Sequence, residues 1–274
     1  MEYTKGIDVS YAQGVIDWDA LAASGTVDFV MIRAGYGQGT IDKQWKRNAD
    51  ECTRLGIPFG VYWFSYATTV ERAANEAEYC LQAIAPYKLS YPVAWDFEYD
   101  SVKYAAGKGA GITKKLASDM GRAFLARIEE AGYYPMLYTN ADYLSRYFDA
   151  DLAGRYDIWL AQWPSYTPNL ENPPVAVRGG IWQYANDGVV SGVSANVVDL
   201  DACYTDYPTI IEEANKVVYH TREEIKEKAD WGLATFDKLV DMGVLEGVAE
   251  NDYDISRDML RILVINDRAG VYDK

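Results

Sequence analysis

Short apolar runs alternate with amphipathic stretches over the first 205 residues, and this alternation restricts the fold more than any other feature. Six runs have the short, largely apolar character of buried strands: 27–33, 58–64, 91–97, 134–138, 157–163 and 180–184. Helical patterns lie between them, at about 42–56, 70–86 and 113–131. Strands that alternate with helices predict parallel βα units. With a first strand at 6–10 and a last strand near 197–201, we predict an α/β fold, an irregular TIM-like (β/α) barrel.

The small number of histidines and cysteines excludes several kinds of catalytic and metal site. The chain has one histidine, His220, so the first 219 residues cannot build a Ser-His-Asp triad or a histidine-ligated zinc site. Its three cysteines show neither a zinc spacing nor a disulfide framework. A net charge of −15 makes nucleic acid a poor partner, and no apolar run approaches the ~20 residues of a membrane helix. We therefore expect no metal site and no membrane partner, and any acid–base chemistry must use carboxylates.

Two carboxylates stand at the end of one predicted strand. Asp96 and Glu98 are two residues apart, so their side chains leave the same face of the strand, roughly 6.5–7 Å apart at the backbone. Barrel enzymes keep their active sites at this end of the strands. One protonated and one ionised carboxyl group at such a separation suit cleavage of a glycosidic bond. The same pattern is also typical of a solvated acidic pair at a strand end.

Further charged residues fall at comparable positions. Asp8 lies in the first strand and Asp199 in the last, and these strands are neighbours in a closed barrel, so we expect the two side chains to lie close together. A surface turn is the alternative for Asp199 and Asp201. Arg33 ends a buried strand, and we expect it to pair with an acid of the cleft.

Eight motifs in order resemble one known family. They are GIDVS at 6–10, IRAGYG at 32–37, GVYWF at 60–64, WDFE at 95–98, LYTN at 137–140, IWLA at 158–161, IWQY at 181–184 and VDL at 198–200. This set, which spans about three quarters of the chain, resembles glycoside hydrolase family 25, the Chalaropsis-type lysozymes. The resemblance implies a peptidoglycan hydrolase that cleaves the β-1,4 bond between N-acetylmuramic acid and N-acetylglucosamine, without a cofactor.

The resemblance also assigns roles to the four acids. Glu98 matches the general acid of the family. Asp96 matches the carboxylate that orients the N-acetyl group of the substrate or stabilises the cationic intermediate. Asp8 and Asp199 match the acids that flank the cleft.

Tyr62 and Tyr138 match tyrosines of the cleft, whereas Trp63 stands where the family often has histidine. Secreted members of the family carry signal peptides, and none is visible here. This difference indicates either a phage endolysin that a holin releases from the cytosol or a mature secreted chain.

Aromatic and basic residues supply further candidates. Trp159, Trp163 and Trp182 are expected either to stack on sugars or to pack in the core. Residues 101–113 are rich in glycine but lack the spacing of a phosphate-binding loop. We expect this segment to be a loop in the wall of the active site, where its lysines, Lys103 and Lys108, meet carboxylates of the stem peptides.

The composition changes after residue 208, which divides the chain into a catalytic barrel, 1–208, and a small helical C-terminal region, 209–274. A capping box at Thr221 predicts a helix to about residue 242, and a second helix at 255–267 holds the apolar run 259–265. A helix with such a run must be buried nearly all round. Two helices are too small to bury it, so we expect this region to dock on a second copy of the chain and form a twofold dimer; the alternatives are docking on its own barrel or on the cell wall. The stretch 236–247 faintly resembles surface-layer-homology repeats, which favours wall binding as much as dimerisation.

Two other functions fit the same pattern. A catalytically inactive barrel that binds the cell wall would not need all four acids. A chitinase-like hydrolase of N-acetylglucosamine polymers also uses Asp-x-Glu at a strand end, but its longer acidic motif is missing from residues 91–98.

Overall fold

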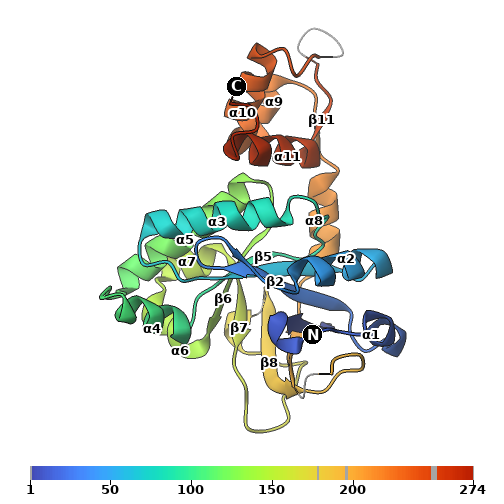
Figure 1. Cartoon of the computed structure of the whole chain (residues 1–274), viewed down its shortest axis with the longest axis vertical. Coiled ribbons are helices and arrows are strands. Elements are labelled where there is room, and N and C mark those ends of the chain that lie inside the picture. Colours follow the sequence, from blue (N-terminus) through green and yellow to red (C-terminus); the bar gives the residue numbers. More distant parts are fainter. Residues whose placement is uncertain (1, 178, 195–196, 248–251, 274) are drawn as a thin grey trace.

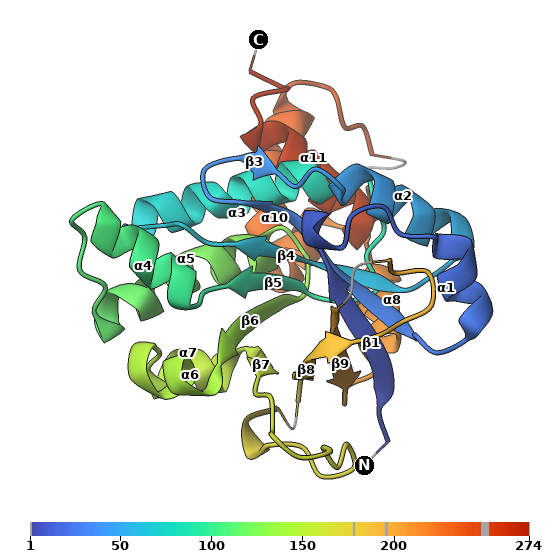
Figure 2. The same cartoon turned by 60° about the horizontal axis from the view of Figure 1, so that its bottom comes forward.

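Eight strands close into a barrel in the computed structural model, which describes residues 2–177, 179–194, 197–247 and 252–273 (Figures 1 and 2). The order around the barrel is β1-β9-β8-β7-β6-β5-β4-β2, and a β1–β2 pair closes it. The strands are β1 (Thr4–Val9), β2 (Phe29–Tyr36), β4 (Phe59–Phe64), β5 (Val93–Asp96), β6 (Pro135–Asn140), β7 (Asp157–Ala161), β8 (Ile181–Gly188) and β9 (Val198–Cys203). A short strand, β3 (Thr40–Ile41), pairs with the end of β2. The predicted irregular barrel and its strands are confirmed.

The helices of the barrel begin and end where local sequence signals place them. They are α1 (Trp18–Ser24), α2 (Trp45–Leu55), α3 (Val70–Ile84), α4 (Tyr99–Gly107), α5 (Lys114–Glu130), α6 (Ala141–Tyr147) and α7 (Ala150–Arg155), with 3₁₀ turns at Tyr11–Gln13 and Val175–Val177. The Thr113 hydroxyl accepts a hydrogen bond from the backbone of Leu116 and so caps α5, while Gly132 follows the helix with a φ of +77°. One expectation is wrong: the predicted loop at 101–113 is helical up to Gly107.

The last strand runs against the others. β9 is antiparallel to both β1 and β8, so the barrel is not built from parallel βα units alone. Asp199, near the start of β9, therefore lies at the same end of the barrel as the carboxyl ends of the parallel strands. The register pairs Asp8 with Asp199 directly, as the closed barrel predicted.

The C-terminal region has a core of its own. It consists of α8 (Tyr207–Asn215), α9 (Arg222–Lys228), α10 (Asp230–Asp241) and α11 (Arg257–Arg268), with a two-stranded sheet of β10 (Val218–Tyr219) and β11 (Ile255–Ser256). Buried residues from these elements form a cluster separate from the barrel: Tyr219, Ile225, Ala229, Phe236, Ile255 and Leu260. Figure 1 shows α9, α10 and α11 stacked above α3, with α8 leading up from the barrel. We call the part from β10 to α11 the appendix.

Two expectations about the helices of the appendix are wrong. The predicted helix from 221 to 242 is two helices that break at Ala229, which leaves room for a small core. The helix that holds the run is not buried all round, because Met259 and Ile262 are 43 % and 46 % exposed. Leu260 packs inside the appendix, and Ile265 packs against the core of the barrel. The chain therefore covers part of the run with its own surfaces.

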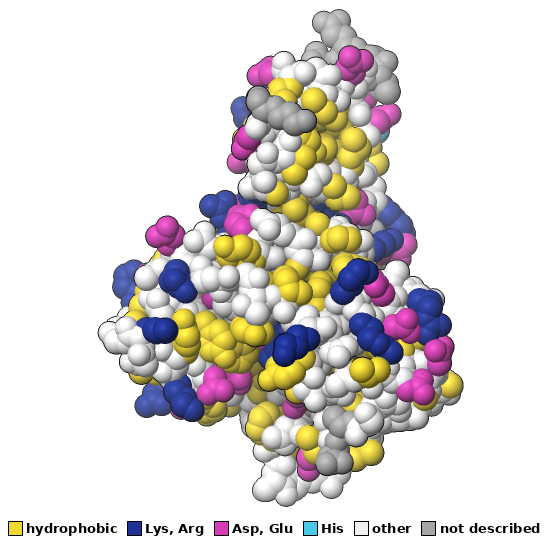
Figure 3. All heavy atoms as spheres, viewed as in Figure 1, with side chains coloured by type: hydrophobic (Ala, Val, Ile, Leu, Met, Phe, Trp, Pro, Cys, Tyr) yellow, Lys and Arg dark blue, Asp and Glu magenta, His cyan; other side chains and the backbone are white. Residues whose placement is uncertain are grey.

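The surface carries charged side chains of both signs between scattered apolar ones, and apolar side chains are frequent over the appendix (Figure 3). In the described ranges, no helix has both the length and the apolar character that a membrane span requires.

Candidate active site

The acids that the sequence singled out lie at one end of the barrel, where the parallel strands have their carboxyl ends. We call this end the mouth. Asp96 is the last residue of β5, where it pairs in register with Phe64 of β4 and Tyr138 of β6. Glu98 follows as the residue before α4, and its backbone N–H donates to the Ser101 hydroxyl at 3.2 Å. The short strand and the helix start thus fix both carboxyl groups at the carboxyl end of the sheet.

Glu98 retains its proton to a higher pH than an ordinary glutamate does. Burial, followed by the negative charges of Asp100 and Asp199, raises the pKa of its carboxyl group to about 7. The side chain is nevertheless partly exposed and lines an open cavity. A half-open carboxylic acid with a pKa near 7 is suited to donate a proton to a bound substrate.

Asp96 lies deeper, with 3 % of its surface exposed. Burial and the neighbouring Glu98 raise the pKa of Asp96, while the guanidinium of Arg33 acts in the opposite direction. When Glu98 carries the proton, its repulsion of Asp96 disappears, and the ionised form of Asp96 becomes easier to reach.

A second buried carboxyl pair lies on β1 and β9. The carboxyl groups of Asp8 and Asp201 lie close enough for the charge of Asp201 to raise the pKa of Asp8, and burial together with the charge of Asp199 raises the pKa of Asp201. Gln183 on β8 donates to Asp8 at 2.7 Å, and the Trp159 indole donates to Asp201 at 2.7 Å. Burial, then the charges of Asp199 and Asp201, raises the pKa of Asp8.

Asp199 is the more accessible flanking acid. Burial raises the pKa of its carboxyl group to about 6. The mouth therefore concentrates carboxyl groups whose pKa values are raised, an arrangement that costs stability and is typical of functional sites.

The two predicted cleft tyrosines line the interior below the acids. Tyr62 and Tyr138 are each 8 % exposed, and both rings meet the Trp159 ring edge-on, at centroid distances of 5.7 and 4.6 Å. Tyr138 donates from its hydroxyl to the Gln183 side-chain oxygen at 3.2 Å. Burial raises the pKa of both phenols, so they stay neutral donors.

Arg33 pairs with an acid that the sequence analysis did not single out. Its guanidinium pairs with Asp42 at 2.8 Å, and the Asp42 side chain is fully buried. Arg33 also lies 4.9 Å from the ring centroid of Tyr11 and 5.6 Å from that of Tyr36. The arginine thus lies in the cleft, anchored by an acid from the segment after β3 rather than by one of the four predicted acids.

The tryptophans divide by exposure. Trp159 is 1 % exposed and Trp182 is 5 % exposed, with the Trp182 indole donating to the Gln162 carbonyl at 2.8 Å. Trp163 is 51 % exposed and donates to Gln183 at 3.1 Å. Exposure favours Trp163 over the other two as a ring that contacts a sugar.

Two hollows extend from the acids along one side of the mouth. The first has a volume of about 540 Å³ and is lined by Glu98, Arg33 and Tyr11 among others. The second, of about 800 Å³, is lined by Arg72, Lys103 and Lys108 from α3 and the α4 region. They share Tyr36, Thr40, Tyr66 and Asp100, so together they form one groove, with charges of both signs beside Glu98 and mainly basic side chains at its far end.

Sequence reasoning missed residues whose role depends on distant partners. Gln183 links Asp8 to Tyr138 and Trp163, and it lay unnoticed in the IWQY motif. Asp42 and Tyr66 gave no local signal. Asp201 was weighed only as a surface acid, although its side chain is fully buried. In a half-buried strand, residues 199 and 201 face the same way, and this spacing was the available signal.

Among the described residues, the grouping with the spacing of metal ligands lies elsewhere. It consists of His220, Asp252 and Asp254, in the appendix and away from the mouth. The four acids of the mouth are not part of it.

Comparisons with known proteins bear on the barrel. The profile of glycosyl hydrolases family 25 matches residues 7–193. The autolytic lysozyme of Clostridium acetobutylicum is 26 % identical over 197 residues, which cover 72 % of this chain and 55 % of that protein. Lysozyme M1 of Streptomyces globisporus is 25 % identical over 199 residues, covering 70 % of this chain and 65 % of the relative. The chain thus spans little more than half to two thirds of the length of these relatives.

A solved structure shares the fold. The modular autolysin LytC from Streptococcus pneumoniae superposes with a TM-score of 0.63 at 29 % identity, over 74 % of this chain and 47 % of that one. LytC has also been solved in complex with a synthetic peptidoglycan ligand.

Proposed function

Because the chain belongs to glycosyl hydrolase family 25, we propose that it is a lysozyme that cleaves the β-1,4 bond between N-acetylmuramic acid and N-acetylglucosamine in bacterial peptidoglycan. The observation that carries this proposal is the pair of carboxyl groups at the end of β5, in which burial raises the pKa of Glu98 to about 7 and Asp96 is the more deeply buried of the two. Its proposed place of action is the bacterial cell wall, which it reaches by holin release, as a phage endolysin does, or by secretion.

In the proposed reaction, Glu98 donates its proton to the glycosidic oxygen as the bond from that oxygen to the anomeric carbon breaks. Asp96, ionised, stabilises the positive charge that develops at the sugar or orients its N-acetyl group. A water molecule then bonds to the anomeric carbon, and its proton returns to Glu98. The reaction adds one water across the bond and needs no cofactor.

The other residues of the mouth support these two. We assign Asp8 and Asp199 to the flanks of the bound glycan, and Tyr62 and Tyr138 to neutral hydrogen bonds beneath it. The positive charge of Arg33 acts to lower the pKa of Asp96 and so favours its ionised form.

Stacking on a sugar is assigned to Trp163, because it is half exposed. Trp159 supports the cleft from the barrel interior, where its indole N–H donates to Asp201. Trp182 lies in the cluster on the other side of the sheet and donates to the Gln162 carbonyl, so we assign it a packing role.

The groove favours a substrate whose uncharged part lies beside Glu98 and whose negative charges lie at the basic end of the groove. A glycan strand with stem peptides has this charge distribution, because the peptides carry carboxylates. We therefore place stem-peptide carboxylates near Lys103 and Lys108, at the basic end of the groove.

We propose residues 1–208 as the catalytic unit and 209–274 as a region for dimerisation or wall binding. The exposed Met259 and Ile262 are the contact proposed for a homodimer. Light scattering of the full chain tests it: a dimer that the Ile262→Glu variant converts to monomer supports this contact, and a monomeric full chain refutes it.

Mass spectrometry of digested peptidoglycan tests the proposed reaction. Products with N-acetylmuramic acid at the new reducing end are expected, and none should form with Glu98→Gln. New N-acetylglucosamine reducing ends would instead indicate the chitinase-like specificity. Binding without any new reducing end would identify an inactive wall-binding barrel.

A further inference from the structure

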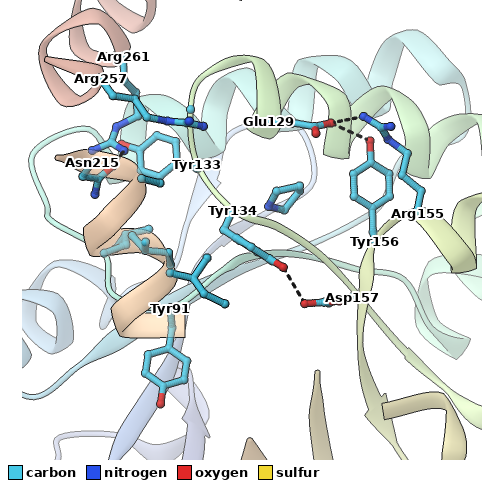
Figure 4. Close-up of a pocket in the computed structure, with 16 residues that line it drawn as sticks. Tyr91, Glu129, Tyr133, Tyr134, Arg155, Tyr156, Asp157, Asn215, Arg257 and Arg261 are labelled. Atoms are coloured by element: carbon cyan, nitrogen blue, oxygen red, sulfur yellow. Dashed lines mark hydrogen bonds and ion pairs between the residues drawn. The ribbon is translucent and has the colours of Figure 1, made fainter. Parts of the chain in front are cut away.

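A cavity of about 260 Å³ lies at the end of the barrel opposite the mouth, beneath the appendix. Residues around the starts of β5, β6 and β7 form one side of it, among them Tyr91, Tyr134 and Asp157. The other side comes from α8 and α11, with Asn215, Arg257 and Arg261 (Figure 4). Nothing in the proposed reaction uses this cavity.

The polar groups on the barrel side of the cavity satisfy one another. Arg155 donates to Glu129 at 2.6 Å, and the Tyr156 hydroxyl donates to the same carboxylate at 3.4 Å. Asp157 accepts hydrogen bonds from Tyr134, at 2.9 Å, and from Tyr207. This side therefore offers a ligand mainly ring surface and tyrosine hydroxyls.

The arginines on the appendix side keep unused donors. The Arg261 side chain is 7 % exposed, pairs with Asp258 and donates to Asn215 at 3.4 Å, yet its Nε has no acceptor. Its guanidinium lies over the Tyr133 ring, 4.3 Å from the centroid. A buried N–H without an acceptor costs free energy that a ligand oxygen would recover.

Arg257 is the second arginine of this side, one helical turn before Arg261. Its buried Nε also lacks an acceptor, and its guanidinium contacts the Tyr219 phenol and, at 6.0 Å, the Trp231 ring. Within the described ranges no carboxylate pairs with it. A guanidinium that no described carboxylate pairs with is unusual in a chain with a net charge of −15, and guanidinium groups recognise carboxylate and phosphate through paired hydrogen bonds.

We propose that this cavity binds a small organic anion, whose carboxylate or phosphate group meets Arg257 and Arg261 and whose body lies against Tyr133 and Tyr134. Its volume corresponds to about nine water molecules at ~30 Å³ each, enough for one sugar ring or a short peptide. Such a ligand contacts both the barrel and α11, so its binding also stabilises the docked position of the appendix.

Calorimetric titration of the full chain tests this site with three probes: inorganic phosphate, N-acetylmuramic acid and N-acetylglucosamine. The last has the same ring as N-acetylmuramic acid but no carboxylate, so it is expected to bind at this site at least tenfold more weakly. Binding of phosphate alone identifies a phosphate ligand, and binding of N-acetylmuramic acid alone identifies a carboxylate; either result supports the site.

Variants separate this cavity from the mouth. Arg257→Gln is expected to weaken anion binding at least tenfold, whereas Lys226→Gln makes the same charge change at an exposed position of the appendix and is expected to leave it unchanged. Ala214→Phe places a larger side chain in the cavity while leaving both arginines in the sequence, and it is expected to abolish binding. Failure of both anions to bind, or binding that survives both Arg257→Gln and Ala214→Phe, overturns the proposal. Neither result would affect the proposed cleavage reaction, which is measured by turnover.

Discussion

The mouth of the barrel gathers carboxyl groups, whereas the opposite end, beneath the appendix, gathers guanidinium groups. At the mouth, Asp8 and Asp96 are buried, Glu98 and Asp199 are partly exposed, and the pKa of every one is raised. At the opposite end, Arg155 has a carboxylate partner at 2.6 Å. Mutual repulsion among the acids at the mouth destabilises the folded protein, and such a concentration of raised pKa values is typical of a functional site.

Glu98→Gln is the substitution with the largest expected effect on this comparison. The amide keeps the shape of the side chain but cannot donate the proton, so turnover of peptidoglycan should fall by about 10²–10⁴-fold while wall binding persists. Glu129→Gln makes the same change at the opposite end and should leave turnover within twofold. Near wild-type turnover of Glu98→Gln would contradict the role of this residue.

Asp96→Asn should lower kcat by about 10²-fold with a smaller change in KM, because its charge acts on the transition state rather than on the bound substrate. The matched control is Asp157→Asn, whose amide oxygen can still accept from the two tyrosines at the opposite end. A higher KM with unchanged kcat for Asp96→Asn would assign Asp96 to binding alone.

The pH dependence of kcat/KM should show the titration of Glu98. The reaction needs the protonated form, so the rate should fall about tenfold per pH unit above a pKa of about 7. Buffers of constant ionic strength and a soluble glycan substrate make this measurable. A descending limb that begins near pH 4.5, the ordinary value for glutamate, would contradict the effect of burial.

Asp8→Asn should have the smallest effect, and it should be stabilising. The folded-state pKa of Asp8 is raised, so this acid favours the folded state below its unfolded pKa and loses that contribution as the pH rises through the folded pKa. Asparagine keeps the hydrogen bond from Gln183 and removes the charge. We expect Tm to rise by about 2–4 °C at pH 7 and to change less at pH 4. A lower Tm at pH 7 would show that the carboxylate is compensated.

How much of this structure could be predicted depended on the range of the interactions. Local signals were sufficient for the strands, for the cap at Thr113 and for the carboxyl pair after β5. The antiparallel direction of β9 was not predictable, because alternation of apolar runs does not encode strand direction. Residues 101–107 are followed closely by glycines, which favour a turn, yet they are helical because α4 begins directly after Glu98.

Contacts between distant segments account for the remaining misses. Arg33 is paired with Asp42, and Gln183 joins Asp8 across 175 positions of sequence. The cavity beneath the appendix is lined by residues that lie between Leu89 and Arg261 in the sequence, so no single stretch of sequence predicts it.

The protonation state of Glu98 carries the central claim, and a carbon-13 NMR titration of its carboxyl group measures it directly. Comparison of spectra from the wild-type chain and from Glu98→Gln assigns the resonance. We predict a pKa of about 7 for Glu98 in the folded protein. A midpoint near 4.5 would show that the mouth does not hold this proton at neutral pH, and it would contradict the assignment of Glu98 as the general acid.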